Sequence, residues 1–348
     1  MSSAHEHFIF RCLQLAKKGI NHVHPNPMVG CVITIPDEKA NFGERIIGEG
    51  YHKKYGGPHA EVNAINSVDD QSLLTQSTAY VSLEPCSHFG KTPPCANLLI
   101  EKKVKKVVVA SLDPNPLVAG RGIKMLQDAG IDVHVNVLQT KAEDLNRRFY
   151  TFHQKKRPYV TLKWAQTQNG FINDASKKQT SISNPLSQQI VHQLRSTEAA
   201  IMIGANTAKI DNPSLTTRNW AGQHPVRVLL DAQLSTSMEH KLFTDGFKSL
   251  VFNEKRSGKD GEVNYIDQSP KDLNAVLEVL HELGINSVLV EGGSQVLQSF
   301  INENLWDEAF VFESRLRLKN GVKAPEINLD HFDLKNVGNN ILKHYINR

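Results

Sequence analysis

The sequence is poor in cysteine, with four in 348 residues, and it has no stretch of about 18 uncharged apolar residues, the length that a membrane-spanning helix needs. Its N-terminal segment, MSSAHEHFIFRCLQLAKK, lacks the apolar core of a secretory signal. We therefore expect no membrane contact and a cytoplasmic location. Because the cytoplasm is reducing, cysteines placed close together there indicate metal binding or redox catalysis rather than a structural disulfide.

Few aromatic residues and little net charge limit the classes of partner. Aromatic residues make up 7% of the chain and the net charge is +4, with a pI near 8.7. No Lys/Arg-rich face suited to a phosphate backbone is visible, and no GxGxxG fingerprint of a Rossmann fold is present. We expect no nucleic-acid partner, and the small positive excess fits a phosphorylated small molecule or an anionic cofactor.

What the chain does have is the composition of an ordinary globular protein, with 40% hydrophobic and 22% charged residues. Its length predicts two domains, because a single core stops growing near about 250–300 residues. Strands alternate with helices in both halves, which predicts an α/β fold for each. The expected boundaries are residues 1–145 for the first domain, 146–157 for a polar, basic linker and 158–348 for the second domain.

Hydrophobic periodicity and the positions of Gly and Pro predict the individual elements. The strands expected in the first domain are residues 28–35, 45–50, 79–83, 107–111 and 132–138, and the helices are residues 6–18, 59–68, 94–103 and 123–129. The strands expected in the second domain are residues 159–164, 200–204, 226–231, 249–252, 287–291 and 308–312, and the helices are residues 185–196, 272–283 and 295–303.

Three candidate metal ligands, His59, Cys86 and Cys95, each directly follow a proline at or near an expected helix start. Backbone N–H groups and the positive end of a helix stabilise a thiolate there. Three N/S ligands leave one tetrahedral position of a zinc ion for water, as in catalytic zinc sites. Glu61, two residues after His59, is suited to carry protons. Zinc nucleobase deaminases use such a His-x-Glu and Pro-Cys signature, although here eight residues separate the cysteines instead of two.

Other readings of these residues stay open. Cys12 and Cys31 lie in apolar stretches and are expected to be core residues. His88 is a possible fourth ligand of a purely structural zinc site, but Glu61 would then have no task. Iron could also occupy a site of this ligand type.

The strings PNPMVGCVI (25–33), GEGYHKKYGGPHAEVNAI (48–65), LEPCSHFGKTPPC (83–95) and DPNPLVAGRG (113–122) resemble the deaminase half of bifunctional riboflavin-biosynthesis deaminase-reductases. The longer cysteine spacing is typical of that family. The resemblance implies a cytidine-deaminase-like three-layer domain, one Zn²⁺ held by His59, Cys86 and Cys95, and hydrolytic loss of the 2-amino group of 2,5-diamino-6-ribosylamino-4(3H)-pyrimidinone 5′-phosphate, with Glu61 as the proton carrier. It also implies substrate contacts at Asn26, His52, His88, Lys91 and Asn115, although a role as turn formers alone stays open for Asn26 and Asn115, which stand in Pro-Asn-Pro runs.

In the second half, an apolar strand runs into Glu291, Gly292 and Gly293 and then a helix, a weak signal for an anion site at a helix N-terminus. The strings KWAQTQNGFI (163–172), IMIGANTAKIDNPSLTTR (201–218), PVRVLLD (225–231) and VEGGSQVL (290–297) strengthen it. They resemble the reductase half of the same family, which implies a dihydrofolate-reductase-like fold and NADPH-dependent reduction of the ribosyl group to ribityl, giving 5-amino-6-(5-phosphoribitylamino)uracil.

This second resemblance implies a set of binding residues. For NADPH they are Ala165, Ser181, Thr207, Asp211, Gly293, Ser294, Gln295, Val296, Leu297, Gln298 and Ser299. For the substrate they are Gln179, Arg195, Leu215, Arg218 and Glu291, where Arg195 and Arg218 offer guanidinium groups to the ribose phosphate. Thr167, Gln168, Asn169 and Ser181 depart from the family pattern, which puts details of the cofactor contacts in doubt.

Two other functions compete with this reading. One is a deaminase acting on nucleic acid whose second half binds RNA, but the low aromatic content and small net charge give it little support. The other is a reductase whose zinc-bound first domain is inactive, which the presence of Glu61 beside all three ligands disfavours. We expect a small-molecule substrate and a homo-oligomer.

Overall fold

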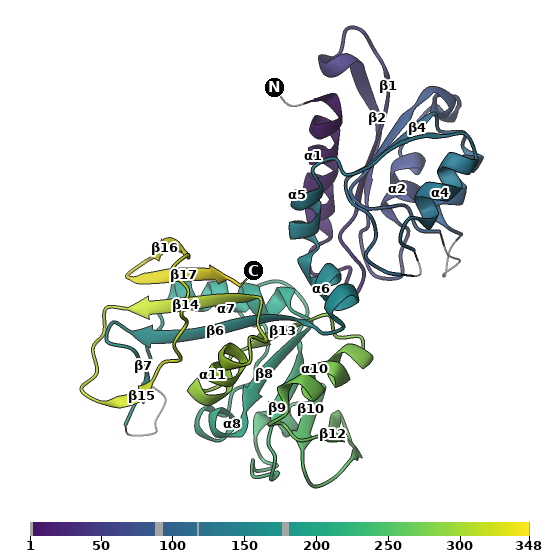
Figure 1. Cartoon of the computed structure of the whole chain (residues 1–348). Helices are drawn as coiled ribbons and strands as arrows, with labels where there is room; N and C mark the ends of the chain where they lie inside the picture. The colour runs from purple at the N-terminus through teal and green to yellow at the C-terminus, as the bar shows by residue number, and fades with distance from the viewer. Residues whose placement is uncertain (1–2, 88–92, 117, 176–180, 348) are drawn as a thin grey trace. The chain divides into compact units, whose positions relative to one another are not determined.

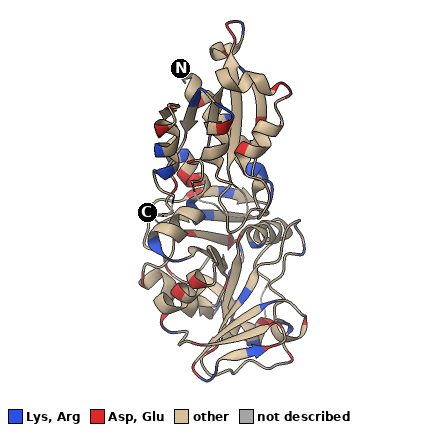
Figure 2. Cartoon of the chain, turned by 90° about the vertical axis from the view of Figure 1, so that its right-hand side faces the viewer, with Lys and Arg blue, Asp and Glu red and all other residues tan. Residues whose placement is uncertain are grey.

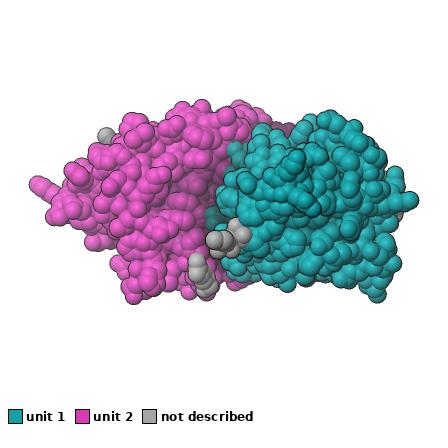
Figure 3. All heavy atoms as spheres, turned by 90° about the horizontal axis from the view of Figure 1, so that it is seen from above, with its two compact units in different colours: residues 1–155 teal, residues 156–348 magenta. Residues whose placement is uncertain are grey.

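The computed structural model describes residues 3–87, 93–116, 118–175 and 181–347 (Figure 1). By its internal contacts the chain divides into two compact units, Met1–Lys155 and Lys156–Arg348 (Figure 3). Residues 146–157, which the sequence predicts as a linker, contain helix α6 (Arg147–Lys155) of the first unit. Each unit is described by itself.

The first unit contains a five-stranded sheet in the order β2-β1-β3-β4-β5. Its strands are β1 (Gly30–Pro36), β2 (Glu44–Tyr51), β3 (Thr78–Val81), β4 (Lys106–Val109) and β5 (Asp132–His134). The strand β1 is antiparallel to β2 and β3, whereas β3, β4 and β5 are parallel. The central strands are almost wholly apolar because both of their faces are covered.

Helices cover both faces of this sheet. They are α1 (Ala4–Ala16), α2 (Ala60–Asn66), α3 (Cys95–Glu101), α4 (Arg121–Asp128) and α5 (Gln139–Leu145), with short 3₁₀ turns at Lys17–Gly19, Asn41–Gly43 and Gln71–Gln76. Val32, Tyr80 and Val108 share a core with α1 and α5. The alternate strand residues Cys31 and Ile33 pack with α2, α3 and α4. The unit is therefore the three-layer α/β domain that the sequence predicts.

The second unit contains a ten-stranded sheet in the order β11-β12-β10-β9-β8-β13-β6-β14-β17-β16, and a two-stranded ribbon of β7 and β15. The strands are β6 (Tyr159–Thr167), β7 (Phe171–Asp174), β8 (Ala200–Gly204), β9 (Val226–Leu230), β10 (Ser249–Asn253), β11 (Gly258–Asp260), β12 (Val263–Asp267), β13 (Ser287–Val290), β14 (Glu308–Ser314), β15 (Gly321–Lys323), β16 (Asp333–Val337) and β17 (Asn340–Ile346). All neighbours from β12 to β14 are parallel, and the pairings of β11, β16 and β17 are antiparallel.

Five helices cover this second sheet. They are α7 (Pro185–Thr197), α8 (Ala205–Asp211), α9 (Lys241–Thr244), α10 (Leu273–Glu282) and α11 (Ser294–Asn302). The helices α10 and α11 share the core of Leu162, Val288 and Trp306, whereas α7, α8 and α9 pack against the opposite face. Parallel strands with helices on both faces place ligand sites at the carboxyl ends of the strands.

The strand expected over 132–138 is shorter in the structure and ends at His134. Asn136 and Leu138 have φ values of 64° and 57°, which a strand cannot contain. No helix of the described residues is long and apolar enough to span a membrane. Figure 2 shows residues of both charge signs in both units.

Candidate active sites

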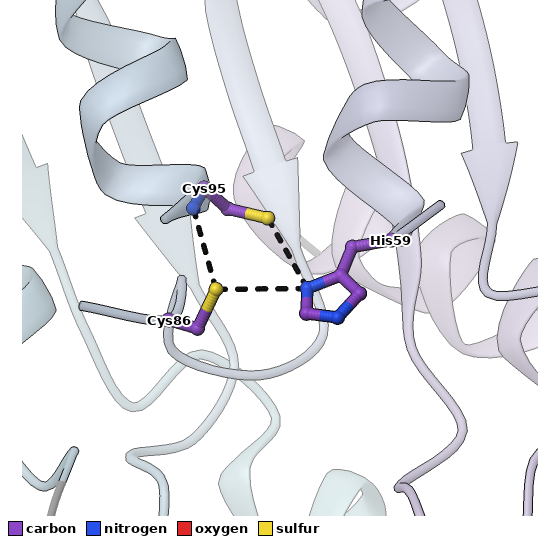
Figure 4. A group of neighbouring side chains, drawn as sticks. All are labelled: His59, Cys86 and Cys95. Carbon is purple, nitrogen blue, oxygen red and sulfur yellow. Dashed lines mark hydrogen bonds between the residues drawn. The ribbon is translucent and has the colours of Figure 1, made fainter. Parts of the chain in front are cut away.

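The three candidate ligands of the first unit lie together at the N-terminal ends of two helices (Figure 4). His59 caps the N-terminus of α2, and Cys95 is the first residue of α3. Cys86 lies in the loop that follows β3. His59 Nδ1 is 3.6 Å from Cys86 Sγ and 3.3 Å from Cys95 Sγ. Pro58 and Pro94 thus precede the helices that present His59 and Cys95, whereas Pro85 begins no helix and Cys86 reaches the cluster from a loop, which corrects the expected helix start there.

These distances fit a shared zinc ion. With Zn–N near 2.0 Å and Zn–S near 2.3 Å in tetrahedral geometry, the nitrogen and sulfur atoms should lie about 3.6 Å apart. The ligand atoms of all three residues lie within 4.8 Å of one another. The set offers one nitrogen and two sulfurs, which zinc prefers, and leaves room for a fourth ligand.

The electrostatics of the cluster favour a cation. Hydrogen bonds from the Cys95 thiol and from His59 lower the pKa of Cys86 to about 4, so Cys86 is a thiolate at neutral pH. The Cys95 backbone N–H, at the start of α3, also donates to Cys86 Sγ at 3.3 Å. The same thiol–thiolate hydrogen bond raises the pKa of Cys95. A negative sulfur beside two further donors of metal-ligand type is the charge distribution that a divalent metal neutralises.

Glu61 lies in the first turn of α2 and is 3% exposed. Burial, followed by the charge of Cys86, raises its pKa to about 7. A carboxyl group with such a pKa can accept and donate a proton at neutral pH. The sequence interpretation gave Glu61 this task, and the structure places it beside the ligand cluster.

Asn26 and His52 also lie next to the cluster. His52 Nδ1 lies 3.1 Å from the Pro58 carbonyl, so Nδ1 carries the proton, and Nε2 accepts from Asn26 Nδ2 at 3.2 Å. The rings of His52 and His59 are 5.4 Å apart, edge to face. Burial lowers the pKa of His52, which keeps the ring neutral and presents the Asn26 amide in one orientation.

Glu84 is a contributor to this site that the sequence interpretation missed. It is 3% exposed and lies two residues before Cys86. Its carboxylate accepts backbone N–H groups of Asp113 and Gly120, in the loop before α4, and of Gly122 and Ile123, in the first turn of α4. A β-carbon at Gly122 would clash with the Pro85 carbonyl. The DPNP turn of this loop, closed by the Asn115 N–H donating to Asp113 Oδ1, is therefore held against the metal-ligand segment.

In the second unit, Glu291 and Arg195 form a buried pair. Arg195 Nε and Nη2 donate to the two carboxylate oxygens at 2.7 and 2.9 Å, and Lys163 Nζ lies 3.6 Å from Glu291 Oε2. Burial alone would raise the pKa of Glu291, but Arg195 and Lys163 lower it to about 2. The sequence interpretation assigned the Arg195 guanidinium group to the ribose phosphate. In the structure this group binds Glu291 instead. Lys163 was missed, although it is a lone charge in an otherwise largely apolar strand.

A cavity of about 270 Å³ lies beside this pair. Four residues that the sequence interpretation selected line it together: Arg195, Asp211, Leu215 and Arg218. Lys241, which was not selected, adds a third cation to the wall after Arg195 and Arg218. Because the Arg195 side chain is engaged by Glu291, Arg218 and Lys241 are the cations available to a phosphate group in this cavity.

Two glycines form a narrow cradle at the carboxyl ends of the adjacent strands β8 and β13. A β-carbon at Gly204 would lie 2.9 Å from Val296 Cγ2, and one at Gly293 would lie 3.2 Å from Thr207 Oγ1. Gly204 caps α8 and Gly293 caps α11. The glycines thus let two helix N-termini pack closely against neighbouring side chains, and backbone N–H groups at helix N-termini are suited to an anionic cofactor such as a dinucleotide, which the residues present fit.

The remaining residues selected for the cofactor lie in several settings. Ala165 is half-buried on β6, and Ser181 is exposed. Ser294, Gln295 and Val296 form the first turn of α11, and Ser299 Oγ donates to the Gln295 carbonyl. Leu297 is part of the core, and Gln298 hydrogen-bonds to the Glu326 backbone and lines another cavity. His88, Lys91 and Gln179 lie outside the described residues.

Comparisons with known proteins match both units. Residues 2–111 match the family model described as the cytidine and deoxycytidylate deaminase zinc-binding region, and residues 158–313 match the model of the RibD C-terminal domain. The riboflavin biosynthesis protein RibD of Aquifex aeolicus is 39% identical over 307 residues, covering 86% of this chain and 84% of that protein. RibD of Bacillus amyloliquefaciens is 38% identical, covering 92% of this chain and 87% of that protein.

Solved structures agree with the sequence relatives. A diaminohydroxyphosphoribosylaminopyrimidine deaminase/5-amino-6-(5-phosphoribosylamino)uracil reductase from Thermotoga maritima is 36% identical, with a TM-score of 0.85 over 98% of this chain and 97% of that one. RibD of Acinetobacter baumannii is 32% identical, with a TM-score of 0.87 over 98% of both chains.

Proposed function

The chain belongs to the RibD family of bifunctional riboflavin-biosynthesis deaminase-reductases, and we propose that its two sites act in turn on one pyrimidine ribotide. The family joins a zinc-binding deaminase to an NADPH-dependent reductase, and this chain holds both domains. The proposed substrate is 2,5-diamino-6-ribosylamino-4(3H)-pyrimidinone 5′-phosphate, and the final product is 5-amino-6-(5-phosphoribitylamino)uracil. The first domain would comprise residues 1–145 and the second 158–348, joined through 146–157.

The ligand cluster with Glu61 beside it is the observation that carries the deaminase half. His59, Cys86 and Cys95 would hold one Zn²⁺. When bound, the ion supplies the Lewis acidity that brings the pKa of a water molecule close to neutrality. Glu61, buried and with a pKa near 7, takes up the proton of the attacking water and delivers it to the departing amine. The product is the ring carbonyl compound and ammonia.

The neighbouring residues would orient the substrate ring in this site. The Asn26 amide is fixed by His52, and Asn115 lies in the turn that Glu84 anchors. We propose substrate contacts for Asn26, His52 and Asn115, and also for His88 and Lys91. These contacts would make the site specific for one pyrimidine ribotide among the amino-substituted compounds that a zinc-bound water could hydrolyse.

The reductase half would act at the cavity and the glycine cradle of the second unit. NADPH supplies a hydride when it is bound. Gly293, Thr207 and the first turn of α11 would bind its phosphates, with Asp211, Ala165 and Ser181 as further contacts. Arg218 would meet the ribotide phosphate, and the pair of Arg195 and Glu291 would lie against the sugar, with Leu215 and Gln179 as further substrate contacts.

We also propose that the protein is a cytoplasmic homo-oligomer. Several large apolar side chains are exposed on or near β16 and β17, the edge of the ten-stranded sheet: Phe332, Leu334, Ile341 and Ile346. An unpaired strand edge with apolar residues favours pairing with a second copy. Sedimentation of the purified protein tests this directly, and a monomer at micromolar concentration would contradict it.

Mass spectrometry of the products tests the proposed function. The purified protein is given the diaminopyrimidinone ribotide with and without NADPH, and ammonia is measured in parallel. We expect the deaminated ribosyl compound without NADPH and the ribityl compound with it. Absence of ammonia release from zinc-loaded protein would overturn the assignment of this deaminase substrate. It would favour the alternative that the first domain acts on nucleic acid. Deamination without reduction would overturn the reductase assignment.

A further inference from the structure

The segment 215–218 forms one wall of the 270 Å³ cavity, and three side chains hold its backbone. Arg195 Nη1 donates to the Thr216 carbonyl at 3.4 Å. The Thr217 N–H donates to His224 Nδ1 at 3.2 Å, and the Arg218 N–H donates to His192 Nδ1 at 3.2 Å. Two consecutive peptide groups are therefore held by imidazole nitrogens, an arrangement that works only while those nitrogens carry no proton.

Of these two histidines, His192 is the one that packing holds in place. It is 5% exposed on α7, whereas His224 is exposed. A buried ring offers its acceptor nitrogen at a fixed position because close packing limits its rotamers. Arg218 itself is exposed, so the hydrogen bond to His192 ties the backbone of this exposed residue to the buried face of α7.

The charges around His192 keep its ring neutral. Burial lowers its pKa, and the cations Arg195 and Arg218 lower it further, while Glu291 and the Thr216 backbone act in the opposite direction. At neutral pH the ring is an acceptor at Nδ1. Protonation in acid would turn Nδ1 into a donor that faces the Arg218 N–H, and this contact would become repulsive.

We propose that His192 is a positioning residue for the phosphate site of the reductase: by accepting the Arg218 N–H, it holds the Arg218 guanidinium where the phosphate of the ribotide binds. This inference rests on the proposed reductase function. It predicts that acidification weakens binding of the phosphorylated substrate through His192 without changing the reducing step itself. The role is distinct from contact with substrate, since His192 acts through the backbone of Arg218.

Three variants test this role. His192→Leu removes the acceptor, and His192→Asn replaces Nδ1 by an amide oxygen that accepts but does not titrate. His331→Leu makes the first change on an exposed loop residue and is the control. The reductase kcat and KM are measured with 5-amino-6-(5-phosphoribosylamino)uracil and NADPH from about pH 7.5 to about pH 4.5, a range that extends well below the ordinary histidine pKa because the pKa of His192 is lowered by burial. The KM for NADPH reports whether the cofactor site is intact.

We expect His192→Leu to raise the KM for the ribotide about tenfold at neutral pH with little change in kcat, since the Arg218 backbone has lost the acceptor that ties it to α7. His192→Asn should keep the wild-type KM at neutral pH and remove most of its rise in acid. An unchanged KM in His192→Leu, or a His192→Asn protein as impaired as His192→Leu, would overturn the proposal. Wild-type protein that reduces nothing would instead overturn the proposed function, so the two failures are distinguishable.

Discussion

At the scale of single residues, substitution of Gly293 tests the proposed NADPH site most directly. A β-carbon there would lie 3.2 Å from Thr207 Oγ1, at the N-terminus of α11 where the phosphates of NADPH are proposed to bind. Gly293→Val should raise the KM for NADPH at least about tenfold, because the added side chain collides with Thr207 and displaces the N-terminal turn of α11. Steady-state kinetics at varied NADPH measures this. The deaminase rate is the control, and an unchanged KM for NADPH would place the cofactor elsewhere.

The lowered pKa of Glu291 predicts how the stability of the fold changes in acid. Its pKa is about 2 in the folded chain against an ordinary value of 4.5. A lowered carboxyl pKa stabilises the fold above the ordinary value, and this contribution is lost as the pH falls from about 4.5 towards about 2. The gap between the two values corresponds to about 3 kcal/mol. Wild-type protein should lose this amount of its free energy of unfolding across that range.

All three tryptophans, Trp164, Trp220 and Trp306, belong to the second unit. Urea unfolding followed by tryptophan fluorescence therefore reports on the unit that contains Glu291. The variant Glu291→Gln should be less stable than wild type at neutral pH, since Arg195 and Lys163 lose their partner, and the difference should shrink in acid. A difference that stays constant down to about pH 2 would show that Glu291 is not the group responsible.

At the scale of elements, Glu84 connects the end of β3 to the start of α4. Its carboxylate accepts four backbone N–H groups of residues 113–123, which a neutral amide cannot do equally well. Glu84→Gln should lower the free energy of unfolding of the first unit by about 3 kcal/mol and raise the deaminase KM. Circular dichroism and deaminase kinetics measure the two effects. Glu101→Gln on the exposed end of α3 is the control, and equal behaviour of both variants would refute the anchoring role.

The sequence predicts the buried elements well because their signal is local. Residues 200–204 were expected as a strand and form β8, and residues 185–196 were expected as a helix and lie within α7. The missed strands β16 and β17 are half-exposed and of mixed polar composition, so neither apolar runs nor strict alternation marks them. The pairing of β17 with β14 joins segments distant in the sequence, which no local pattern contains, whereas β16 pairs with β17 across the short turn at Gly338 and Asn339, a local hairpin signal that the sequence interpretation did not use.

The residues of the candidate sites also divide into those that a local sequence pattern marks and those that it does not. His59, Glu61, Cys86 and Cys95 could be selected because proline and helix starts mark their chemistry locally. The pairing of Arg195 with Glu291 could not be foreseen, because the two residues lie 96 positions apart. Glu84, after the end of β3, and Lys163, within β6, were missed because a single charge in or near a strand has no motif of its own. Their partners become visible only in the folded sheet.

At the scale of the whole molecule, each core cluster among the described residues draws its members from one unit only. Residues 1–155 and 156–348, expressed separately, should therefore each fold and keep one activity. A zinc chelator should abolish deamination by the first fragment and lower its thermal midpoint, while the second fragment keeps its midpoint and its reductase rate. Loss of structure in the isolated second fragment would contradict this division of the chain.

The central claim is that one chain carries two separate sites for two successive steps, and the variant Glu61→Gln tests it most directly. Zinc-loaded Glu61→Gln protein is given NADPH and, in parallel reactions, the diaminopyrimidinone ribotide or its deaminated ribosyl product, and the products are identified by mass spectrometry. The account predicts that the first compound remains unchanged and that the second is converted to the ribityl compound at the wild-type rate. Deamination at the wild-type rate, or failure to reduce the second compound, would contradict it.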